Sequence, residues 1–502
     1  MALLATTAIS QRSPELRVKD EILVKFTAGT NDSSITKLNR GIGASVIEKL
    51  GDLRWQRMKL PPGLSVDDAI AKYSKQQSVE AVQPNFYYHL LATPDDPLFG
   101  NLYGMAKISA PAAWDLTTGS SAVIVADIDT GMRYTHEDLA PNVWINPGEI
   151  ENNGIDDDGN GFVDDYHGYD FRFNDPDPID EHGHGTHTAG TIGAAGNNLL
   201  GVVGVSWNVK IMAIKIYSSS GSDSSSAILI NAYNYVRMMK NRGVNIRVTN
   251  NSYGGCPEAC GSDVATRDAL DALGEAGVLN VFAAGNGSDD NDTHPSYPVS
   301  YDLPSIIGVA ASTSTDDRAS FSNWGQHTVD LAAPGVGIWS TTFGSDSSYG
   351  IMGGTSMATP HVAGAAALLS AFNPSLSAAS LKATLLNTVD PLTGWAATPT
   401  KTNGRLNVFN ALQNQTVCSF ALANDTIRVP RKGGYFSVSV TAAANCDYSA
   451  KPNAGWIHIS DKNAFSGSET VTFRVSTSPG LRRSGTINIG GQILTVNQSQ
   501  IE

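Results

Sequence analysis

Five short apolar segments recur between residues 122 and 311, and they constrain the fold more than any other feature of the chain. They read AVIVADID, VKIMAIKI, VNIRVTN, VLNVFAA and SIIGVAA, and helix-like stretches separate them. Continuously apolar strands that alternate with helices are typical of a parallel sheet covered on both faces. We therefore expect an α/β domain with a doubly wound, mostly parallel sheet. Functional residues of such sheets gather at the carboxyl ends of the strands.

Different patterns flank this sheet in the sequence. Before residue 93, the strand-like runs EILVKF and WQRMKL alternate with helical stretches around 31–40 and 66–77, which predicts a small α+β, ferredoxin-like unit. After residue 416, apolar and polar residues alternate, as in YFSVSV at 435–440, which predicts an all-β sandwich. We expect an unstructured N-terminal segment over 1–14 and three domains over 15–93, 94–416 and 417–502.

Charge is distributed unevenly among these segments. The chain carries a formal net charge of −14, yet residues 94–416 alone hold 14 Lys/Arg against 34 Asp/Glu, a net −20. The flanking domains are weakly positive, with 11 against 9 over 15–93 and 8 against 5 over 417–502. An acidic surface repels phosphate backbones and attracts cations, which argues against nucleic acid as a partner. The longest apolar runs are too short for a membrane-spanning helix, which needs about 20 residues.

The four cysteines form two pairs that are close in sequence, Cys256 with Cys260 and Cys418 with Cys446. An even number in locally paired positions suits an oxidising compartment, whereas four buried thiols are the alternative. The N-terminal run LLATTAI is too short for an intact secretory signal, and it lacks the basic flank that such a signal has. We expect a secreted protein whose signal is absent from this chain or trimmed.

Three polar motifs carry the chemistry: DIDTG at 127–131, HGTH at 184–187 and GTSMATP at 354–360. Ser356 opens an alanine-rich helix, whose dipole favours negative charge at that end. Neutral His184, in a glycine-lined turn, can accept the hydroxyl proton. A carboxylate at a strand end can orient the imidazole, and both Asp127 and Asp129 point to the same side of that strand.

These motifs, in the order Asp, His, Ser, resemble the subtilisin family of serine proteases over roughly residues 95–412. The resemblance implies an endopeptidase that acts through an acyl-enzyme intermediate. It assigns catalysis to Asp129, His184 and Ser356, and it favours Asp129 over Asp127 because Asp129 matches the family's Asp-Thr-Gly. Asn286 of the AAGN segment at 283–286 would form the oxyanion hole with the Ser356 amide.

Two further histidines lie close to His184 in the sequence. The resemblance gives His187 a structural role. Zinc binding by His182, His184 and His187 is rejected, because the metal would occupy the general base.

The resemblance also places an extended substrate against two segments rich in small residues. An extended peptide can add its backbone to exposed strand edges, so recognition would depend on the main chain more than on side chains. We expect broad specificity with a weak preference for large uncharged residues before the cut. The expected substrate-binding residues are Ser252, Tyr253, Gly254, Gly255, Ala283, Ala284 and Gly285.

The acidic segment at 150–167, IENNGIDDDGNGFVDDYH, opens like a calcium-binding loop. Alternate carboxylates followed by glycine converge oxygens on a hard cation, although a solvated acidic loop is the alternative. The expected ligands are Asp156, Asp158, Asn160, the Phe162 carbonyl, and Asp164 or Asp165. The resemblance alone implies a second calcium site, made by Asp138, Asn198 and carbonyls near Leu200 and Val202.

The flanking domains resemble known accessory domains of such enzymes. Residues 15–93 resemble subtilase propeptides, which implies a zymogen that cuts itself between 88 and 94 and is inhibited by its own prodomain. Residues 417–502 resemble a BACON-type β-sandwich, which implies binding of carbohydrate or a cell-surface polymer, with Trp456 in the core. The alternative function is a catalytically silent subtilase-fold protein used for binding or adhesion, which the intact triad disfavours.

Overall fold

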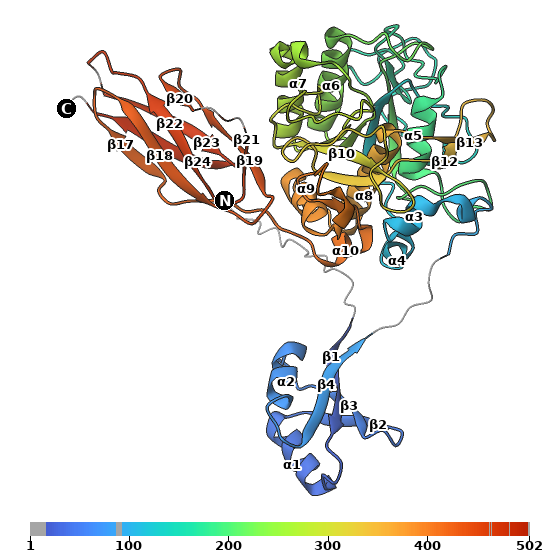
Figure 1. Ribbon diagram of the computed structural model, residues 1–502, viewed down its shortest axis with the longest axis vertical. Coiled ribbons are helices and arrows are strands. Elements are labelled where there is room, and N and C mark those ends of the chain that lie inside the picture. The colour runs from blue at the N-terminus through green and yellow to red at the C-terminus, as the bar shows by residue number, and fades with distance from the viewer. Residues whose placement is uncertain (1–16, 87–92, 461, 463, 481, 500–502) are drawn as a thin grey trace. The chain divides into compact units, whose positions relative to one another are not determined.

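The computed structural model describes residues 17–86, 93–460, 462, 464–480 and 482–499. The segment expected to be unstructured, 1–14, and most of the expected processing stretch, 88–94, lie outside the described residues. The chain divides into two compact units, Met1–Leu91 and Ala92–Glu502 (Figure 1). None of the described helices is both long and apolar enough to cross a membrane.

The first unit is a four-stranded antiparallel sheet with two helices. Its elements are β1 (Arg17–Phe26), α1 (Asp32–Ile42), β2 (Ser45–Leu50), β3 (Trp55–Lys59), α2 (Val66–Tyr73) and β4 (Val79–Phe86). The strand order β2-β3-β1-β4 and the βαββαβ connectivity are those of a ferredoxin-like fold, which confirms the prediction. Ile22, Met58 and Tyr73 are fully buried in its core.

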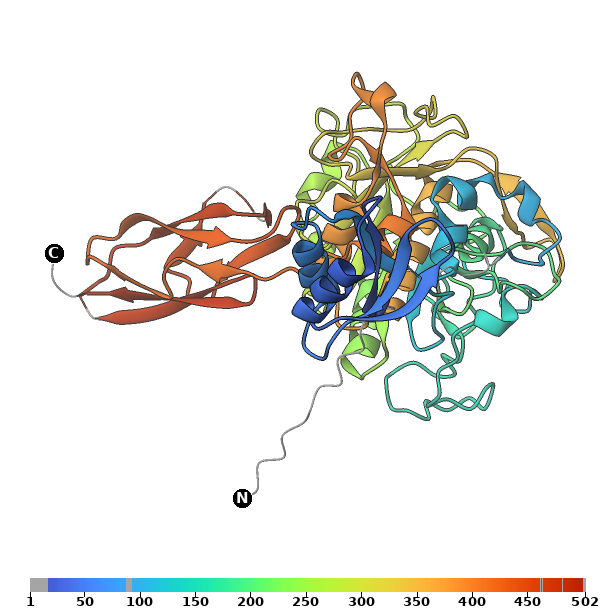
Figure 2. The same cartoon turned by 90° about the horizontal axis from the view of Figure 1, so that it is seen from below.

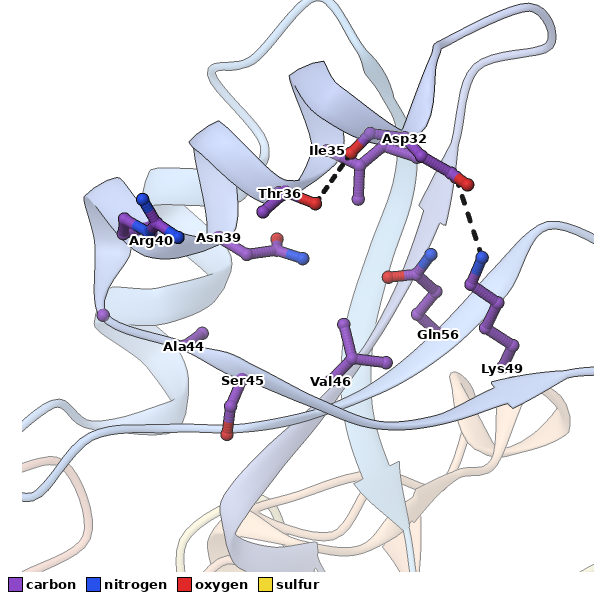
Figure 3. Close-up of a pocket in the computed structure, with 11 residues that line it drawn as sticks. Asp32, Ile35, Thr36, Asn39, Arg40, Ala44, Ser45, Val46, Lys49 and Gln56 are labelled. Carbon is purple, nitrogen blue, oxygen red and sulfur yellow. Dashed lines mark hydrogen bonds and ion pairs between the residues drawn. The ribbon is translucent and has the colours of Figure 1, made fainter.

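An open cavity of about 510 Å³ lies between α1 and β2 of this unit (Figure 3). An ion pair of 3.6 Å between Asp32 and Lys49 crosses it, and the Thr36 hydroxyl donates to the Asp32 carbonyl. Among the described residues that line it, none is a histidine or cysteine.

The second unit contains a nine-stranded sheet in the order β14-β15-β11-β10-β9-β8-β5-β7-β6. Each of the five predicted apolar segments forms one of its strands, and only the β14–β15 pair is antiparallel. This confirms the mostly parallel sheet. The strands are β5 (Ile124–Asp129), β6 (Gly168–Asp170), β7 (Lys210–Lys215), β8 (Ile246–Asn251), β9 (Leu279–Ala283), β10 (Ile306–Ser312), β11 (Leu331–Pro334), β14 (Asp390–Pro391) and β15 (Gly404–Arg405).

Helices cover both faces of this sheet and create two separate cores (Figure 1). On one face lie α5 (His184–Gly193), α8 (Thr355–Phe372) and α9 (Ala378–Asn387); on the other lie α6 (Ser226–Asn241) and α7 (Val264–Glu275). Because strand side chains alternate, Val125 of β5 packs into the α5 and α8 core, whereas Ile128 packs into the α6 and α7 core. Asp127 and Asp129 therefore point toward α5 and α8.

Shorter elements complete this part of the second unit. They are α3 (Tyr103–Lys107), α4 (Ala110–Trp114), α10 (Val408–Gln413) and the antiparallel hairpin of β12 (Ile338–Thr341) and β13 (Tyr349–Met352).

The C-terminal part of the second unit consists of two packed sheets, as predicted (Figure 2). One sheet contains β16 (Ala421–Leu422), β18 (Gly434–Thr441), β22 (Glu469–Val475) and β20 (Ile457–Ile459). The other contains β17 (Thr426–Val429), β24 (Gln492–Gln498), β23 (Arg483–Ile489), β19 (Asp447–Pro452) and β21 (Ala464–Ser466). The β17–β24 pair is parallel, so the sandwich is not wholly antiparallel.

Trp456 is half-buried against the sandwich core beneath the Arg483 guanidinium, 4.3 Å from the ring centroid. It therefore serves mainly as a packing residue. Both cysteine pairs, Cys256–Cys260 and Cys418–Cys446, are disulfide-bonded. The alternative of four free thiols is wrong.

A buried ion pair joins α9 to the sandwich strand β19. Lys382 is 4% exposed, and its Nζ lies 2.7 Å from Asp447 Oδ2. Burial alone would lower the pKa of Lys382, but Asp330 and Asp447 outweigh it and raise the pKa above its ordinary value. The lysine is therefore charged, and Asp447 of the sandwich neutralises it together with Asp330.

Replacing Asp447 by Ala should destabilise the protein, because the buried Lys382 then loses its nearer carboxylate and keeps Asp330, at 3.9 Å. We expect a loss of about 3 kcal/mol in the free energy of unfolding, measured by urea denaturation. Asp425→Ala, at an exposed position of the same sandwich, is the control and should change it by less than about 0.5 kcal/mol. Equal stabilities of the two variants would contradict the role of the pair.

Candidate active site

Asp129 and His184 meet at the carboxyl end of β5. Asp129 is the last residue of the strand and is 2% exposed, and His184 is the first residue of α5. His184 Nδ1 lies 2.7 Å from Asp129 Oδ1. Because a carboxylate only accepts, Nδ1 carries the proton and Nε2 is left as the basic nitrogen. Burial alone would lower the pKa of His184, but the Asp129 charge and hydrogen bond outweigh it and raise the pKa above its usual value.

Several backbone contacts hold α5 against β5. Asp180 accepts hydrogen bonds at 2.8–2.9 Å from the backbone amides of His182 and Gly183, just before the helix, and of Thr186 in its first turn. At Gly185, a Cβ atom would overlap the Gly131 carbonyl oxygen and lie 3.1 Å from Asp129 Cβ. Glycine is therefore needed for the close approach. Sequence reasoning missed Asp180, since an acid four residues before a helix carries no distinctive signal.

Ser356 lies in the first turn of α8, on the same side of the sheet. In this structure its Oγ donates to the Ser252 carbonyl at 2.9 Å. Next to it, the Thr355 backbone amide and hydroxyl both donate to Asn286 Oδ1, at 2.9 and 3.0 Å. This anchors the Asn286 carbonyl oxygen and leaves its Nδ2 as a donor beside the serine.

One cavity of about 240 Å³ gathers these groups. Six of the seven expected substrate-binding residues line it: Ser252, Tyr253, Gly254, Gly255, Ala283 and Gly285. The seventh, Ala284, is fully buried and packs behind the cavity in a cluster with Trp395, because successive residues at the end of β9 face opposite sides.

Sequence reasoning missed five other residues of the cavity, Thr130, His182, Tyr217, Gly221 and Thr355. Three of them carried a signal: Thr130 and Thr355 lie in the DIDTG and GTSMATP motifs, and Tyr217 lies two residues beyond β7. Strand ends of a parallel sheet meet at one edge.

The neighbouring histidines are not arranged to bind zinc. His187 is fully buried, and its Nε2 donates to the Ile338 carbonyl at 3.0 Å. Burial lowers the pKa of His187 to about 4, so the ring is neutral and structural. The His182 and His184 rings are 6.3 Å apart.

The acidic loop gathers only part of its predicted ligand set. Oxygens of Glu149, Asp158 and Asp165 lie within 4.8 Å of one another, and Asn160 donates to Asp165 at 2.9 Å. Glu149, which sequence reasoning missed, is 7% exposed, and its Oε2 has no hydrogen-bond partner.

Two other predicted ligands of this loop accept hydrogen bonds from backbone amides. Asp156 accepts from the amides of Asn160 and Gly161, and Asp164 accepts from those of Asn153 and Gly154. These two acids therefore shape turns. The Phe162 ring packs against Tyr169 and Tyr235, and its carbonyl oxygen as a ligand stays a prediction.

Asp138 and Asn198 of the second predicted cation site lie together, but the contacts of Leu200 and Val202 with them are made by backbone amides, so the two carbonyls as ligands stay a prediction. Asp138 accepts from the Asn198 side chain at 2.8 Å and from the Val202 amide at 2.9 Å, and the Leu200 amide donates to Asn198 Oδ1. Asp96 is an additional acid here: it is 4% exposed, its Oδ1 is unpartnered, and burial and the Asp138 charge raise its pKa. Sequence reasoning missed Asp96, because it lies in a polar connecting stretch with no ligand-like spacing.

A base oriented by a buried carboxylate, beside a serine at a helix N-terminus, defines a serine hydrolase on a parallel α/β sheet. Comparison with known proteins agrees. Residues 120–445 match the subtilase family, and residues 5–85 match the fervidolysin N-terminal prodomain. The chain belongs to the subtilase family and is a serine endopeptidase with an N-terminal prodomain.

The alignments of this chain with similar proteins span most of the length of each of those proteins. Thermitase of Thermoactinomyces vulgaris is 36% identical, over 64% of this chain and 99% of thermitase. The thermophilic serine proteinase of Bacillus sp. strain AK1 is 32% identical, over 79% and 88%. A protease structure from Pseudoalteromonas arctica aligns with a TM-score of 0.52 at 28% identity, over 64% of this chain and 99% of that one.

Replacing Gly185 by Ala should impair turnover, because the added methyl group forces α5 away from β5. A displacement of about 1 Å costs on the order of 100-fold in kcat. Peptide hydrolysis, normalised by active-site titration, measures the effect. Gly394→Ala, where a Cβ would meet nothing within 4 Å, is the matched control. Unchanged kcat in Gly185→Ala would show that the close approach is dispensable.

Proposed function

We propose that the chain is the precursor of a secreted endopeptidase that cleaves peptide bonds with Asp129, His184 and Ser356 through an acyl-enzyme intermediate. The observation that carries this proposal is the 2.7 Å contact between His184 and Asp129 in the same cavity as Ser356 and Asn286. The alternative of a silent binding protein lacks support, because the base, its orienting acid and the serine are all present.

The reaction begins when the Ser356 hydroxyl leaves the Ser252 carbonyl and turns toward His184 Nε2. His184 takes the proton as Oγ attacks the peptide carbonyl, and the Asp129 carboxylate stabilises the resulting imidazolium. Asn286 Nδ2 and the Ser356 amide donate to the oxyanion. His184 then returns the proton to the leaving amine, and water hydrolyses the ester by the reverse sequence.

The cavity supports broad specificity for protein and peptide substrates. Its walls are glycines, small residues and the rings of Tyr217 and Tyr253, and Asp129 is the one acid among its described lining residues. Such walls favour large uncharged side chains. Two disulfides support an extracellular location. Carbohydrate binding by the C-terminal sandwich stays a prediction.

Calcium fits the oxygen cluster of the acidic loop. The carboxylates of Glu149, Asp158 and Asp165 are hard oxygen donors, and burial raises the pKa of Asp165 to about 6. Arg242 Nη2, 3.3 Å from Asp158 Oδ1, neutralises only one side of the cluster. A bound cation would satisfy the unpartnered Glu149 Oε2. Asp138, Asn198 and Asp96 form the second candidate site.

Calcium removal should lower the melting temperature of the protein, and it should lower that of the Glu149→Gln variant by less. A ligand at 100 times its Kd stabilises by about 2.7 kcal/mol. The measurements are bound calcium per chain and the melting temperature with calcium or chelator, in Ser356→Ala chains that cannot digest themselves. Glu151→Gln, an exposed acid of the same loop, is the control. Equal calcium content in both variants would remove Glu149 from the site.

Turnover should fall as the pH drops through the pKa of His184, because the protonated ring cannot accept the serine proton. The Asp129 charge places this pKa above the ordinary value of about 6.5, and the rate should fall about tenfold per unit below it. The measurement is kcat for an uncharged peptide substrate as a function of pH, and the decline on the acidic side gives the pKa of His184. A profile that is flat from about pH 5 to 9 would contradict His184 as the base.

Ser356→Ala should abolish self-processing, because it removes the nucleophile and one oxygen atom only. The wild-type chain should be cut between 88 and 94, since the linked segment is an intramolecular substrate of high effective concentration. Mass spectrometry of chains made in a protease-deficient host decides the matter. Ser347→Ala, an exposed serine, should be processed normally. Trimming of the Ser356→Ala chain would refute autocatalysis.

A further inference from the structure

A second buried carboxyl group lies beside the Asp129–His184 pair. Asp127 is 2% exposed and points from β5 to the same side as Asp129. Its Oδ2 lies 2.9 Å from Thr188 Oγ1 on α5, and its Oδ1 accepts from Asn250 Nδ2 on β8 at 2.8 Å. The carboxyl group therefore joins three elements of the site.

We propose that Asp127 is a positioning residue whose protonated carboxyl group clamps α5 to β8 and so holds His184 in register with Ser356. The inference rests on the proposed function, because its consequence is measured in the same reaction.

The hydrogen count at Thr188 supports the protonated form. Thr188 Oγ1 lies 2.9 Å from Asp127 Oδ2 and 2.9 Å from the Gly185 carbonyl oxygen. A threonine hydroxyl has one hydrogen, and the carbonyl can only accept. If Thr188 donates to Gly185, the hydrogen in the other contact comes from Asp127. Oδ1 then remains as the acceptor for Asn250 Nδ2, and each hydrogen in these contacts has one acceptor.

The clamp continues from β8 to the nucleophile. Asn250 Nδ2 also donates to Ser252 Oγ at 3.1 Å, and Ser252 Oγ donates to the Ser356 carbonyl at 2.8 Å. In return, Ser356 Oγ donates to the Ser252 carbonyl. At the other end, Thr188 lies one helical turn after His184. One chain of hydrogen bonds thus connects the helix of the base to the helix of the nucleophile.

The surroundings of Asp127 also favour a neutral carboxyl group. Burial, and then the Asp129 charge, raise its pKa well above the ordinary value. His184 of α5 is the titratable group that opposes this, and it already pairs with Asp129.

Charged and titratable groups on the other packed elements face other partners. Lys215 of β7 pairs with Asp170 and Glu181. Arg247 of β8 donates to the carbonyls of Pro374 and Leu376, and the rings of His187 and His361 face backbone carbonyls.

Protonation of Asp127 has a consequence for the base. An ionised Asp127 would add a second negative charge beside His184 and raise its pKa further, so that less of the enzyme would hold a neutral base near pH 7. A neutral Asp127 supplies hydrogen bonds without that charge.

Asp127→Asn tests the protonation state in the processed enzyme, because asparagine has the shape and the donor of the protonated acid. Its Nδ2 can donate to Thr188, and its Oδ1 can accept from Asn250. We expect kcat within about twofold of wild type and an acidic limb of the pH profile within about 0.3 units. A limb that moves down by about one unit or more would show that Asp127 is ionised and overturn the proposal.

Thr188→Val tests the clamp without changing any charge. It removes the partner of the Asp127 hydroxyl, and we expect kcat to fall about tenfold with KM within about twofold. Thr191→Val is the matched control: its hydroxyl, also buried on α5, bonds only to the His187 carbonyl within the helix. Thr188→Ser should restore turnover. Wild-type kcat in Thr188→Val, or equal losses in Thr188→Val and Thr191→Val, would overturn the proposal. Active-site titration of wild type separates this result from failure of the proposed function.

Discussion

The close approach of α5 to the carboxyl end of β5 is the constraint on which the site depends. At Gly185 the helix backbone comes so near to Gly131 and Asp129 that no side chain fits between them. Asp180 accepts from three backbone amides in and just before the first turn of α5. This approach brings His184 Nδ1 to 2.7 Å from Asp129 and fixes which nitrogen is basic. The helix that carries Ser356 packs on the same face, so both reach one cavity.

The buried polar side chains of this protein form small clusters of hydrogen bonds and ion pairs. Each cluster joins different helices and strands. Asp129 serves His184, while Asp127 bonds α5 and β8 from the adjacent position on the same strand face. Lys382 connects α9 with the C-terminal sandwich through Asp447. A buried charge or polar atom without a partner is costly, so each such contact fixes the position of the elements that provide it. The catalytic geometry therefore rests on polar contacts as well as on the two apolar cores.

The acidic surface of the central segment has two structural uses. Some acids build the loops: Asp156 and Asp164 accept from nearby backbone amides and shape turns. Others converge, as Glu149, Asp158 and Asp165 do, with oxygens within 4.8 Å of one another. Spacing in the sequence does not separate the two kinds, because both lie in the same DDDGNG stretch or near it. The direction in which each side chain points decides.

The sequence by itself determined the sheet, the order of the domains and the chemical identity of the site. These predictions used local features: the apolar runs, the strand and helix periodicity, and the DIDTG, HGTH and GTSMATP motifs. Local features are set by propensity and burial pattern. They predicted β5, β7, β8, β9 and β10 and placed Asp129, His184, Ser356 and Asn286 at strand or helix ends. Only the tertiary structure brought in Glu149, Asp96 and Asp180, buried Ala284 behind the cavity, and bonded Asp127 to Thr188. These contacts join residues from separate elements, and their partners depend on how the helices pack on the sheet.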